Sequence, residues 1–322
     1  MAEVKRYQSK GYGAVIAILL NCVFVYLWPI VTEKYWHWSL DYMAANDISM
    51  SVFYIVHGTV LGWIVSITCQ LACYLIYHLE WDMFERYKVL EDPWPWKSNP
   101  DEWWAFLMKT FRVHGFNLFI LGPLSFCVYL LIDANEAMDC TRDGLPSRYQ
   151  FVLQIIFCML LEDLGFHVFH RMLHWPSLYP YVHKIHHEYK VSVAITSNYM
   201  HPMEFLLLIS PVQFGPLILG KHLHIMTSIT WFGIRTFESI EGHCGYEFSW
   251  SPVRIIPFAA DYGYHAYHHS HNVGNYSTFF SLWDTILGSN RQYYKFLQEV
   301  EERESLKAVK VSPKRTRKAA SP

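Results

Sequence analysis

The sequence predicts an all-helical protein that crosses a membrane several times. Only 17% of its 322 residues are charged and 52% are hydrophobic, whereas soluble domains carry about 25% charged residues. Three long runs contain no Asp, Glu, Lys or Arg, and 18 histidines are present. The formal net charge of -2 and the scattered cysteines exclude a basic nucleic-acid-binding protein and a disulfide-stapled secreted module.

The three charge-free runs predict transmembrane helices near residues 13–31, 52–77 and 113–132. A helix needs about 20 apolar residues to cross the hydrocarbon layer, which is about 30 Å thick. Buried helices of a large soluble core rarely stay free of charge for so long. Tyrosines and tryptophans gather at the ends of the first run, as they do at the headgroup level of membrane proteins.

The later apolar segments are shorter. Residues 149–170 predict a fourth span, although Glu162 and Asp163 interrupt it. Residues 205–220 and 222–234 are each too short for a typical span. They predict a re-entrant or interfacial helical hairpin, because periodicity alone does not distinguish these forms.

The distribution of basic residues predicts the orientation. Lys5, Arg6 and Lys10 precede the first span, and the positive-inside rule therefore places the N-terminus in the cytoplasm. The loops at 32–50 and 133–148 then lie on the far side, where lysines and arginines are few. The basic C-terminus fits the cytoplasm.

The chain reads as one membrane domain followed by a tail. Residues 1–297 contain every apolar run and every histidine cluster, without an internal repeat or a Gly/Ser linker. Residues 298–322 mix Lys, Arg, Glu, Ser and Pro, and this composition predicts a charged, flexible tail.

Three histidine boxes indicate a metal site. Their spacing places the histidines of each box on one helix face. The boxes are His170 and His174; His183, His186 and His187; and His265, His268 and His269. Burying so many imidazoles without a metal would be costly, because repulsion and desolvation oppose their protonation. Eight ligands exceed the four of a tetrahedral zinc, so the boxes predict a dinuclear centre.

The boxes also constrain the topology. The first two lie at the cytoplasmic end of the fourth span. The third can join them only if residues 205–234 cross the membrane an even number of times, or not at all.

Other polar residues are candidates for completing the centre. His201 and His243 are isolated histidines that could bind metal. Metal-bound imidazoles usually donate their second N–H to a carboxylate or another polar group, while the alternative is that such groups cap helices or face water. The candidates for this supporting role are Glu162, Asp163, His167, Glu204 and Glu241. No catalytic side chain is expected beyond the metal ligands.

The chemistry is constrained by the setting of the boxes. Imidazole ligands suit zinc, copper, iron or nickel, so the spacing does not name the metal. A histidine-rich dinuclear site beside apolar helices suits O₂ chemistry on a lipid, because oxidation of an unactivated C–H bond requires that water be kept away.

At these residues the chain resembles the fatty acid hydroxylase / sterol desaturase superfamily of membrane di-iron enzymes, and in particular its C-4 methylsterol monooxygenases. The similarity covers residues 80–289. The motifs that carry it are Glu162-Asp163, His170-Arg-Met-Leu-His174, the run from His183 to Lys190, His201-Pro-Met-Glu204, His243-Cys-Gly-Tyr246, Gly274-Asn-Tyr276 and Trp283-Asp284.

The resemblance implies a di-iron monooxygenase of sterol biosynthesis in the endoplasmic reticulum membrane, with its termini and histidine boxes in the cytoplasm. Two irons would be bound by the eight box histidines, and His201 and His243 match further histidines of the family pattern. O₂ would be the co-substrate, and NAD(P)H would supply electrons through cytochrome b5 and its reductase. The substrate would be a sterol or another membrane lipid, with the C-4 methyl group of a sterol favoured.

Two departures keep alternatives open. Phe166 stands where the methylsterol pattern often has a histidine, and Ala266 stands where it often has an aspartate. One alternative is another sterol or lipid hydroxylase or desaturase of the superfamily, such as a side-chain hydroxylase. Another is a non-catalytic membrane subunit that retains the fold, although all eight box histidines are present.

Overall fold

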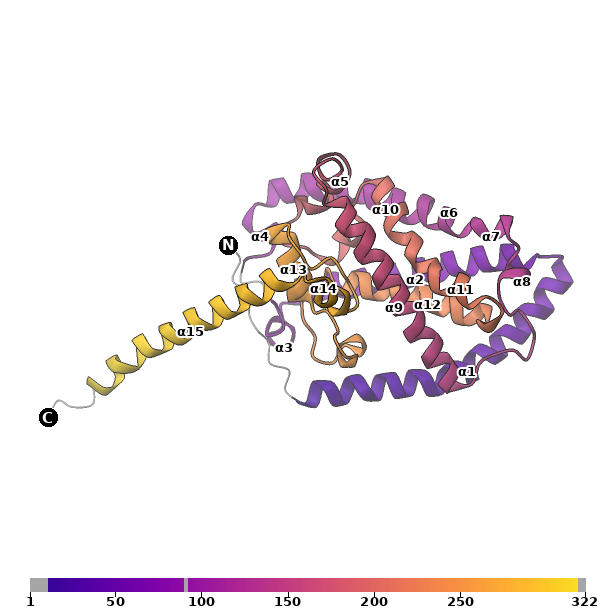
Figure 1. Ribbon diagram of the computed structural model, residues 1–322, viewed down its shortest axis with the longest axis horizontal. Helices are drawn as coiled ribbons and strands as arrows, with labels where there is room; N and C mark the ends of the chain where they lie inside the picture. Colours follow the sequence, from indigo (N-terminus) through magenta and orange to yellow (C-terminus); the bar gives the residue numbers. More distant parts are fainter. Residues whose placement is uncertain (1–10, 90–91, 318–322) are drawn as a thin grey trace.

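The computed structural model describes residues 11–89 and 92–317. Within these ranges the chain forms helices joined by loops and turns, with no β-strand (Figure 1). Lys5, Arg6 and Lys10, on which the predicted orientation depends, lie outside the described residues, as do residues 318–322.

Five helical segments are long and apolar enough to cross a membrane, which confirms the predicted fold class. They are Tyr12–Asn46, Met50–Leu79, Pro100–Leu131, Arg148–Leu173 and Pro202–His222. The first two are α1 (Gly11–Asn46) and α2 (Met50–Leu79), and the fourth is α9 (Arg148–Leu173). The third joins α5 (Pro100–Phe116), the π-helical turn η1 (Asn117–Leu121), α6 (Gly122–Phe126) and α7 (Val128–Leu131).

The remaining elements are short helices and turns, except for the longer helices α12 and α15. They are α3 (Asp82–Glu85), α4 (Pro95–Ser98), α8 (Ala134–Ala137), η2 (Tyr179–His183), η3 (His186–Glu188), η4 (Ala194–Asn198), α10 (Pro202–Ile209), η5 (Ser210–Gln213), α11 (Phe214–Leu219), η6 (Gly220–His222), α12 (Ile225–Glu241), η7 (Pro252–Ile255), α13 (Tyr262–His271), α14 (Leu282–Leu287) and α15 (Arg291–Arg317).

Local sequence explains where α9 begins and ends. At its start the Ser147 side chain accepts a hydrogen bond from the Gln150 N–H, and the Gln150 side chain binds back to Ser147. This reciprocal cap satisfies backbone donors that a helix start leaves without partners. The helix ends at Leu173, with His174 as its C-cap, and Pro176 follows. Proline cannot continue the helical hydrogen bonds, so the first histidine box falls at the end of the span.

The short apolar stretches form a hairpin, as predicted, but its first arm, Pro202–His222, is long and apolar enough to cross a membrane, which the sequence analysis did not expect. The chain runs outward through α10, η5 and α11 and returns through α12. At its tip the Asp139 N–H donates to the Leu223 carbonyl, and the Ile225 N–H donates to the Asp139 carbonyl, both at 2.9 Å. Asp139 belongs to the connection between α8 and α9, so the hairpin runs the length of the bundle. It thereby returns the third box to the end where the first two lie.

The two connections predicted for the far side lie together. Arg142 forms an ion pair with Asp41, and Trp36 Nε1 donates to the Thr141 carbonyl at 3.0 Å. The first of these connections is mostly helical, because α1 continues to Asn46. Both stand at the end of the bundle opposite the histidines.

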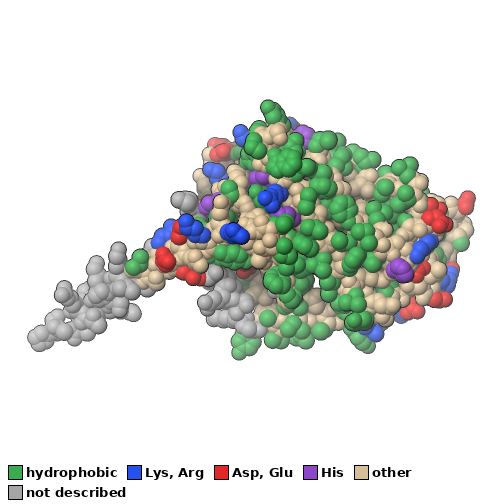
Figure 2. Space-filling view, in the orientation of Figure 1, with side chains coloured by type: hydrophobic (Ala, Val, Ile, Leu, Met, Phe, Trp, Pro, Cys, Tyr) green, Lys and Arg blue, Asp and Glu red, His purple; other side chains and the backbone are tan. Residues whose placement is uncertain are grey.

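The surface has the distribution expected for lipid contact. Figure 2 shows hydrophobic side chains across the middle of the molecule and charged side chains toward both ends. Many apolar side chains of the spans are exposed, including Val31 at 64% and Leu131 at 86%. Because a continuous exposed apolar patch of this size is rare in soluble monomers, the protein is a multi-pass membrane protein.

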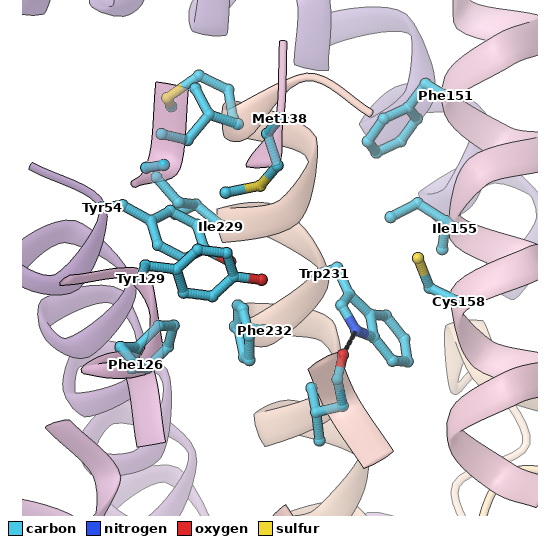
Figure 3. Packing of buried hydrophobic residues seen from close by; sticks show 14 of the residues in the cluster. Tyr54, Phe126, Tyr129, Met138, Phe151, Ile155, Cys158, Ile229, Trp231 and Phe232 are labelled. Atoms are coloured by element: carbon cyan, nitrogen blue, oxygen red, sulfur yellow. Dashed lines mark hydrogen bonds between the residues drawn. The ribbon is translucent and has the colours of Figure 1, made fainter. Parts of the chain in front are cut away.

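An aromatic core fixes α12 against α2 (Figure 3). The Tyr54 hydroxyl lies 2.6 Å from the Ser228 hydroxyl, and the rings of Tyr54 and Tyr129 meet edge to face at 4.6 Å. Trp231 Nε1 donates to the Val212 carbonyl at 2.9 Å. These contacts hold α12, whose last turn leads directly to His243, in a defined position.

The C-terminal elements complete the molecule. α13 carries the third box, and α15 projects away from the bundle (Figure 1). The segment predicted as a flexible tail from residue 298 continues as helix to Arg317. Its composition of Lys, Arg and Glu also favours an exposed helix.

Candidate metal centre

Nine histidines converge in two adjacent groups. In each group every histidine offers a ring nitrogen within 4.8 Å of the others. Group one contains His170, His174, His183, His187 and His268, and group two contains His186, His243, His265 and His269. All eight box histidines and the isolated His243 are therefore brought together.

The second and third boxes each contribute to both groups. In η3 His186 belongs to group two, while its neighbour His187 belongs to group one. On α13, His265 and His269 are four residues apart and share a face toward group two. His268 lies on a different part of the helix surface and reaches group one. Because η3 and α13 each carry histidines of both groups, the two groups lie next to each other.

The nitrogen atoms around His183 fit a shared cation. His183 Nε2 lies 3.1 Å from His170 Nε2 and 2.9 Å from the Nε2 atoms of both His174 and His187. A neutral imidazole nitrogen offers one lone pair or one proton, so at most one of these three contacts is a hydrogen bond. Nitrogens bound at about 2.1 Å to one ion at right angles would lie about 3.0 Å apart. These residues therefore fit a metal ion.

Backbone carbonyls fix the proton on the opposite ring nitrogen. Carbonyl oxygens only accept, so an imidazole whose Nδ1 meets one carries its proton there and leaves Nε2 as a lone pair. Four histidines have this arrangement: His170 with Tyr276 at 2.8 Å, His186 with Tyr199 at 3.2 Å, His243 with Ser239 at 2.7 Å and His268 with Gly274 at 2.7 Å. Their lone pairs are directed into the two groups.

Burial keeps the imidazoles neutral. Burial lowers the pKa of His174 and of His186 to about 4. Burial, with repulsion from His186, lowers the pKa of His243 to about 3. Because metal ions bind only unprotonated imidazole, the groups are ready to bind metal at neutral pH.

Glu204 supports a histidine of group one. Its Oε1 accepts a hydrogen bond from His183 Nδ1 at 2.6 Å, and both side chains are fully buried. Carboxylates that contact metal-binding histidines in this way fix the ring and strengthen it as a ligand. Of the five candidates for this supporting role, only Glu204 forms a hydrogen bond to a grouped histidine within the described residues.

The other candidates have different contacts. Asp163 accepts the backbone N–H groups of Thr278 and Phe279, each at 2.9 Å. His167 Nδ1 lies 3.3 Å from Asp284, and Glu162 pairs with Arg235. These residues hold the segments around the site. Glu241 is buried, and its Oε1 has no hydrogen-bond partner among the described residues.

His201 lies in neither group. Its Nδ1 accepts a hydrogen bond from the Met203 N–H at 3.2 Å and caps the start of α10. An N-cap role uses Nδ1 as an acceptor for the helix's own backbone, so this nitrogen is engaged by α10. We therefore leave His201 out of the proposed ligands.

One functional residue, Arg235, escaped the sequence analysis, and another, Asp284, appeared there only within a motif and without a role. Arg235 donates to Glu162 at 2.6 Å and to Glu238 at 2.8 Å, which ties α12 to α9. The only signal was an arginine directly after an apolar stretch. Asp284 accepts the N–H groups of Tyr276 and Ser277 at 3.0 and 2.9 Å, and thereby positions the Tyr276 carbonyl that binds His170.

A largely apolar cavity opens onto both groups. Its empty volume is about 1420 Å³, which includes open solvent at its mouth. Apolar side chains from α2, α6, α10 and α12 line it, among them Trp63, Phe126 and Phe232. The imidazoles that reach it are His170 of group one and His186, His243 and His265 of group two. An apolar ligand in this cavity would therefore lie against the metal groups.

Comparison with known proteins agrees with this geometry. The family model described as fatty acid hydroxylase matches residues 155–289, which contain all nine histidines. A protein of Dictyostelium discoideum named as a methylsterol monooxygenase is 31% identical over 265 residues, 81% of this chain and 91% of the relative. The chain belongs to the fatty acid hydroxylase family.

Two further relatives show the range of this family. A very-long-chain aldehyde decarbonylase of Oryza sativa is 39% identical to this fatty acid hydroxylase family member over 229 residues, 70% of this chain and 81% of the relative. Methylsterol monooxygenase 1 of Gallus gallus is 29% identical over 219 residues, 67% of this chain and 73% of the relative. No solved structure matches the chain.

Proposed function

We propose that this fatty acid hydroxylase family member is a membrane di-iron monooxygenase that oxidises a sterol at its C-4 methyl group. The observation that carries the proposal is that two groups of buried imidazoles open onto one largely apolar cavity. A cavity of this kind binds an apolar molecule and excludes water, and the imidazoles supply the ligands for redox metals.

The proposed iron ligands are the nine grouped histidines. Bound iron would activate O₂ for attack on a C–H bond of the substrate. The protein's own contribution is to direct the Nε2 lone pairs inward through carbonyl partners such as Tyr276 and Gly274. Glu204 holds His183, the histidine with the most neighbours in group one.

The electron supply and location are part of the same proposal. NAD(P)H would deliver electrons through cytochrome b5 and its reductase, with O₂ as co-substrate. The enzyme would act in sterol biosynthesis in the endoplasmic reticulum membrane, with the histidine groups and both termini on the cytoplasmic side. The basic residues near the N-terminus support this orientation.

The relatives support a sterol substrate, and one observation favours a second candidate. Methylsterol monooxygenases from two organisms match most of this chain. The aldehyde decarbonylase matches with higher identity, over a region shorter than that of the Dictyostelium discoideum relative and slightly longer than that of the Gallus gallus relative. The second candidate substrate is therefore a very-long-chain aldehyde, which the apolar cavity would also accept.

Lipid profiling of cells that lack the protein tests the proposal. We expect 4-methylsterols to accumulate, and we expect the wild-type gene to reverse this while the His268→Ala variant does not. A normal 4-methylsterol pool with accumulated long-chain aldehydes would instead favour the second candidate. Full rescue by His268→Ala would contradict a catalytic metal centre and favour a non-catalytic subunit.

A further inference from the structure

The cavity contains buried polar atoms that have no hydrogen-bond partner among the residues that the structure describes. Four of them belong to lining residues: Thr59 Oγ1, Ser197 Oγ, Glu241 Oε1 and Thr278 Oγ1. Ser197 is fully buried and Glu241 is 8% exposed. Because an unsatisfied buried polar atom is costly, these positions call for a polar group on the ligand that fills the cavity.

Glu241 and Ser197 lie at the end of the cavity next to group two. Glu241 is the last residue of α12 and precedes His243 by two residues. Ser197 precedes Tyr199 by two residues, and the Tyr199 carbonyl accepts the Nδ1–H of His186 at 3.2 Å. A hydroxyl bound by these two side chains would therefore lie beside the histidines of group two.

Thr59 marks a different level of the cavity. The Tyr54 and Ser228 hydroxyls lie 2.6 Å apart, and a Cβ at Gly62 would lie 4.0 Å from Thr236 Oγ1. In both pairs the residue number on α12 exceeds the residue number on α2 by 174. This constant difference means that α2 and α12 run in the same direction here, and it places Thr59 level with Gly233. Gly233 precedes Glu241 by eight residues, which corresponds to about 12 Å along the helix.

The other charged residues of the lining, Arg235, Glu238 and Asp261, each have a partner, which for Asp261 is the Tyr264 N–H at 2.6 Å. Arg235 donates to Glu162 and Glu238, and its guanidinium lies against the rings of Phe166 and Phe279 at 5.3 and 5.6 Å. Glu241, which the sequence suggested as a partner for an imidazole, has no hydrogen bond through Oε1 within residues 11–89 and 92–317. It is therefore the buried carboxylate oxygen of the cavity lining that remains without a partner in this part of the chain.

We propose that Glu241, assisted by Ser197, binds the hydroxyl group of the substrate. The inference rests on the proposed function and specifies which part of the sterol meets the metal groups. In a sterol, the C-4 methyl carbon is separated from the 3-hydroxyl oxygen by three bonds, while the side chain lies at the opposite end of the ring system. A hydroxyl held at Glu241 places the C-4 methyl group near the histidines, and a hydroxyl held at Thr59 would place the side chain there.

A binding experiment on the full-length protein in nanodiscs tests this. The probes are a 4,4-dimethyl-3β-hydroxysterol and its 3-methyl ether, which cannot donate a hydrogen bond. For the wild-type protein we expect the ether to bind at least tenfold more weakly, about 1.4 kcal/mol. In Glu241→Ala we expect this ratio to fall to about one, because only the hydroxysterol loses affinity. Glu241→Gln should keep part of the ratio, since its amide oxygen still accepts.

Further variants keep the result decisive. Ser197→Ala, which removes one oxygen and should fold normally, is expected to lower the ratio two- to threefold. Thr59→Val removes a buried hydroxyl at the other level and should leave the tenfold ratio intact. A wild-type ratio in the Glu241 variants, or loss of the ratio in Thr59→Val, would overturn the inference. Absence of binding by either sterol would overturn the sterol proposal itself, whereas equal binding of both would overturn only the role of Glu241.

Discussion

His183 is the residue on which group one most depends. Its Nε2 lies within 3.1 Å of the Nε2 atoms of His170, His174 and His187. We expect His183→Ala to lower the iron content of the purified protein from two atoms per chain to about one, and to reduce turnover at least 100-fold. Elemental analysis of protein purified from membranes measures this.

His201→Ala is the matched control for that measurement. His201 caps α10 and lies outside both groups, so its loss should cost about 1 kcal/mol of stability and leave both irons bound. Loss of iron from His201→Ala, or full iron retention in His183→Ala, would contradict the ligand set proposed here.

Glu204 contacts His183 and lies outside both histidine groups, so we propose that it acts through His183 rather than by binding metal. Replacing a carboxylate that holds a metal-binding histidine typically weakens metal affinity 10- to 100-fold. We expect Glu204→Gln to lose iron at 10- to 100-fold lower chelator concentrations than the wild-type protein. We also expect it to recover activity when excess iron is supplied. The exposed Glu136 of α8 provides the control Glu136→Gln. A wild-type iron affinity in Glu204→Gln would show that the 2.6 Å contact has no such role.

The sequence revealed the histidines and one partner, Glu204, but not the backbone carbonyls that position the imidazoles. The eight box histidines stand out because their close spacing along the chain is a local property. The expectation that each box shares one helix face was wrong for the second box, which lies on the turns η2 and η3, and for the third, whose His268 reaches the other group. The carbonyls of Tyr276, Tyr199 and Gly274 carry no such signal, because any residue can supply a backbone carbonyl and only the fold decides which one lies nearby. For the same reason, the sequence could not show that His243 joins a histidine group and that His201 does not.

At the scale of elements, α9 and α11 are held at unusually close approach. A Cβ at Gly215 would lie 2.7 Å from the Cα of Cys158, so a side chain there must push α11 away from α9. We expect Gly215→Ala to destabilise the protein by about 1–3 kcal/mol, measured as a lower melting temperature in detergent.

Gly62→Ala is the corresponding control. A Cβ at Gly62 would meet only Thr236 Oγ1, at 4.0 Å, and alanine is intrinsically a better helix former than glycine by about 1 kcal/mol. Gly62→Ala should therefore leave stability unchanged or raise it. Equal destabilisation by both substitutions would show that the close contact at Gly215 does not matter.

The spans could be predicted because a long charge-free run is visible in the sequence itself. The extent of the hairpin could not, because α10, η5 and α11 are interrupted by Pro211 and Gly220 and look too short. Their length becomes clear only from contacts at the tip, where Asp139 pairs with Leu223 and Ile225. Tertiary contacts of this kind leave no periodic pattern.

At the scale of the whole molecule, the fold places the histidine groups and the α8–α9 connection at opposite ends. We expect an impermeant thiol reagent applied to sealed membranes to distinguish Lys184→Cys, beside the second box, from Asp143→Cys, at the opposite end. Each variant should be labelled above the wild-type background from one side of the membrane only, and the side should be opposite for the two variants. Labelling of both from one side would contradict a transmembrane bundle.

The two oddities of the composition, low charge and abundant histidine, are related in the folded molecule. Apolar side chains of the helices line a cavity, and histidines of both groups belong to the same lining. A lipid held in the cavity is therefore presented to the metal groups without leaving the membrane environment.

The metal content of the wild-type protein tests the central claim most directly. Elemental analysis of protein purified from its native membrane in mild detergent should find two iron atoms per chain. The nine grouped histidines account for this number, with five imidazoles in one group and four in the other. Two zinc atoms, or less than one metal atom of any kind per chain, would contradict the account.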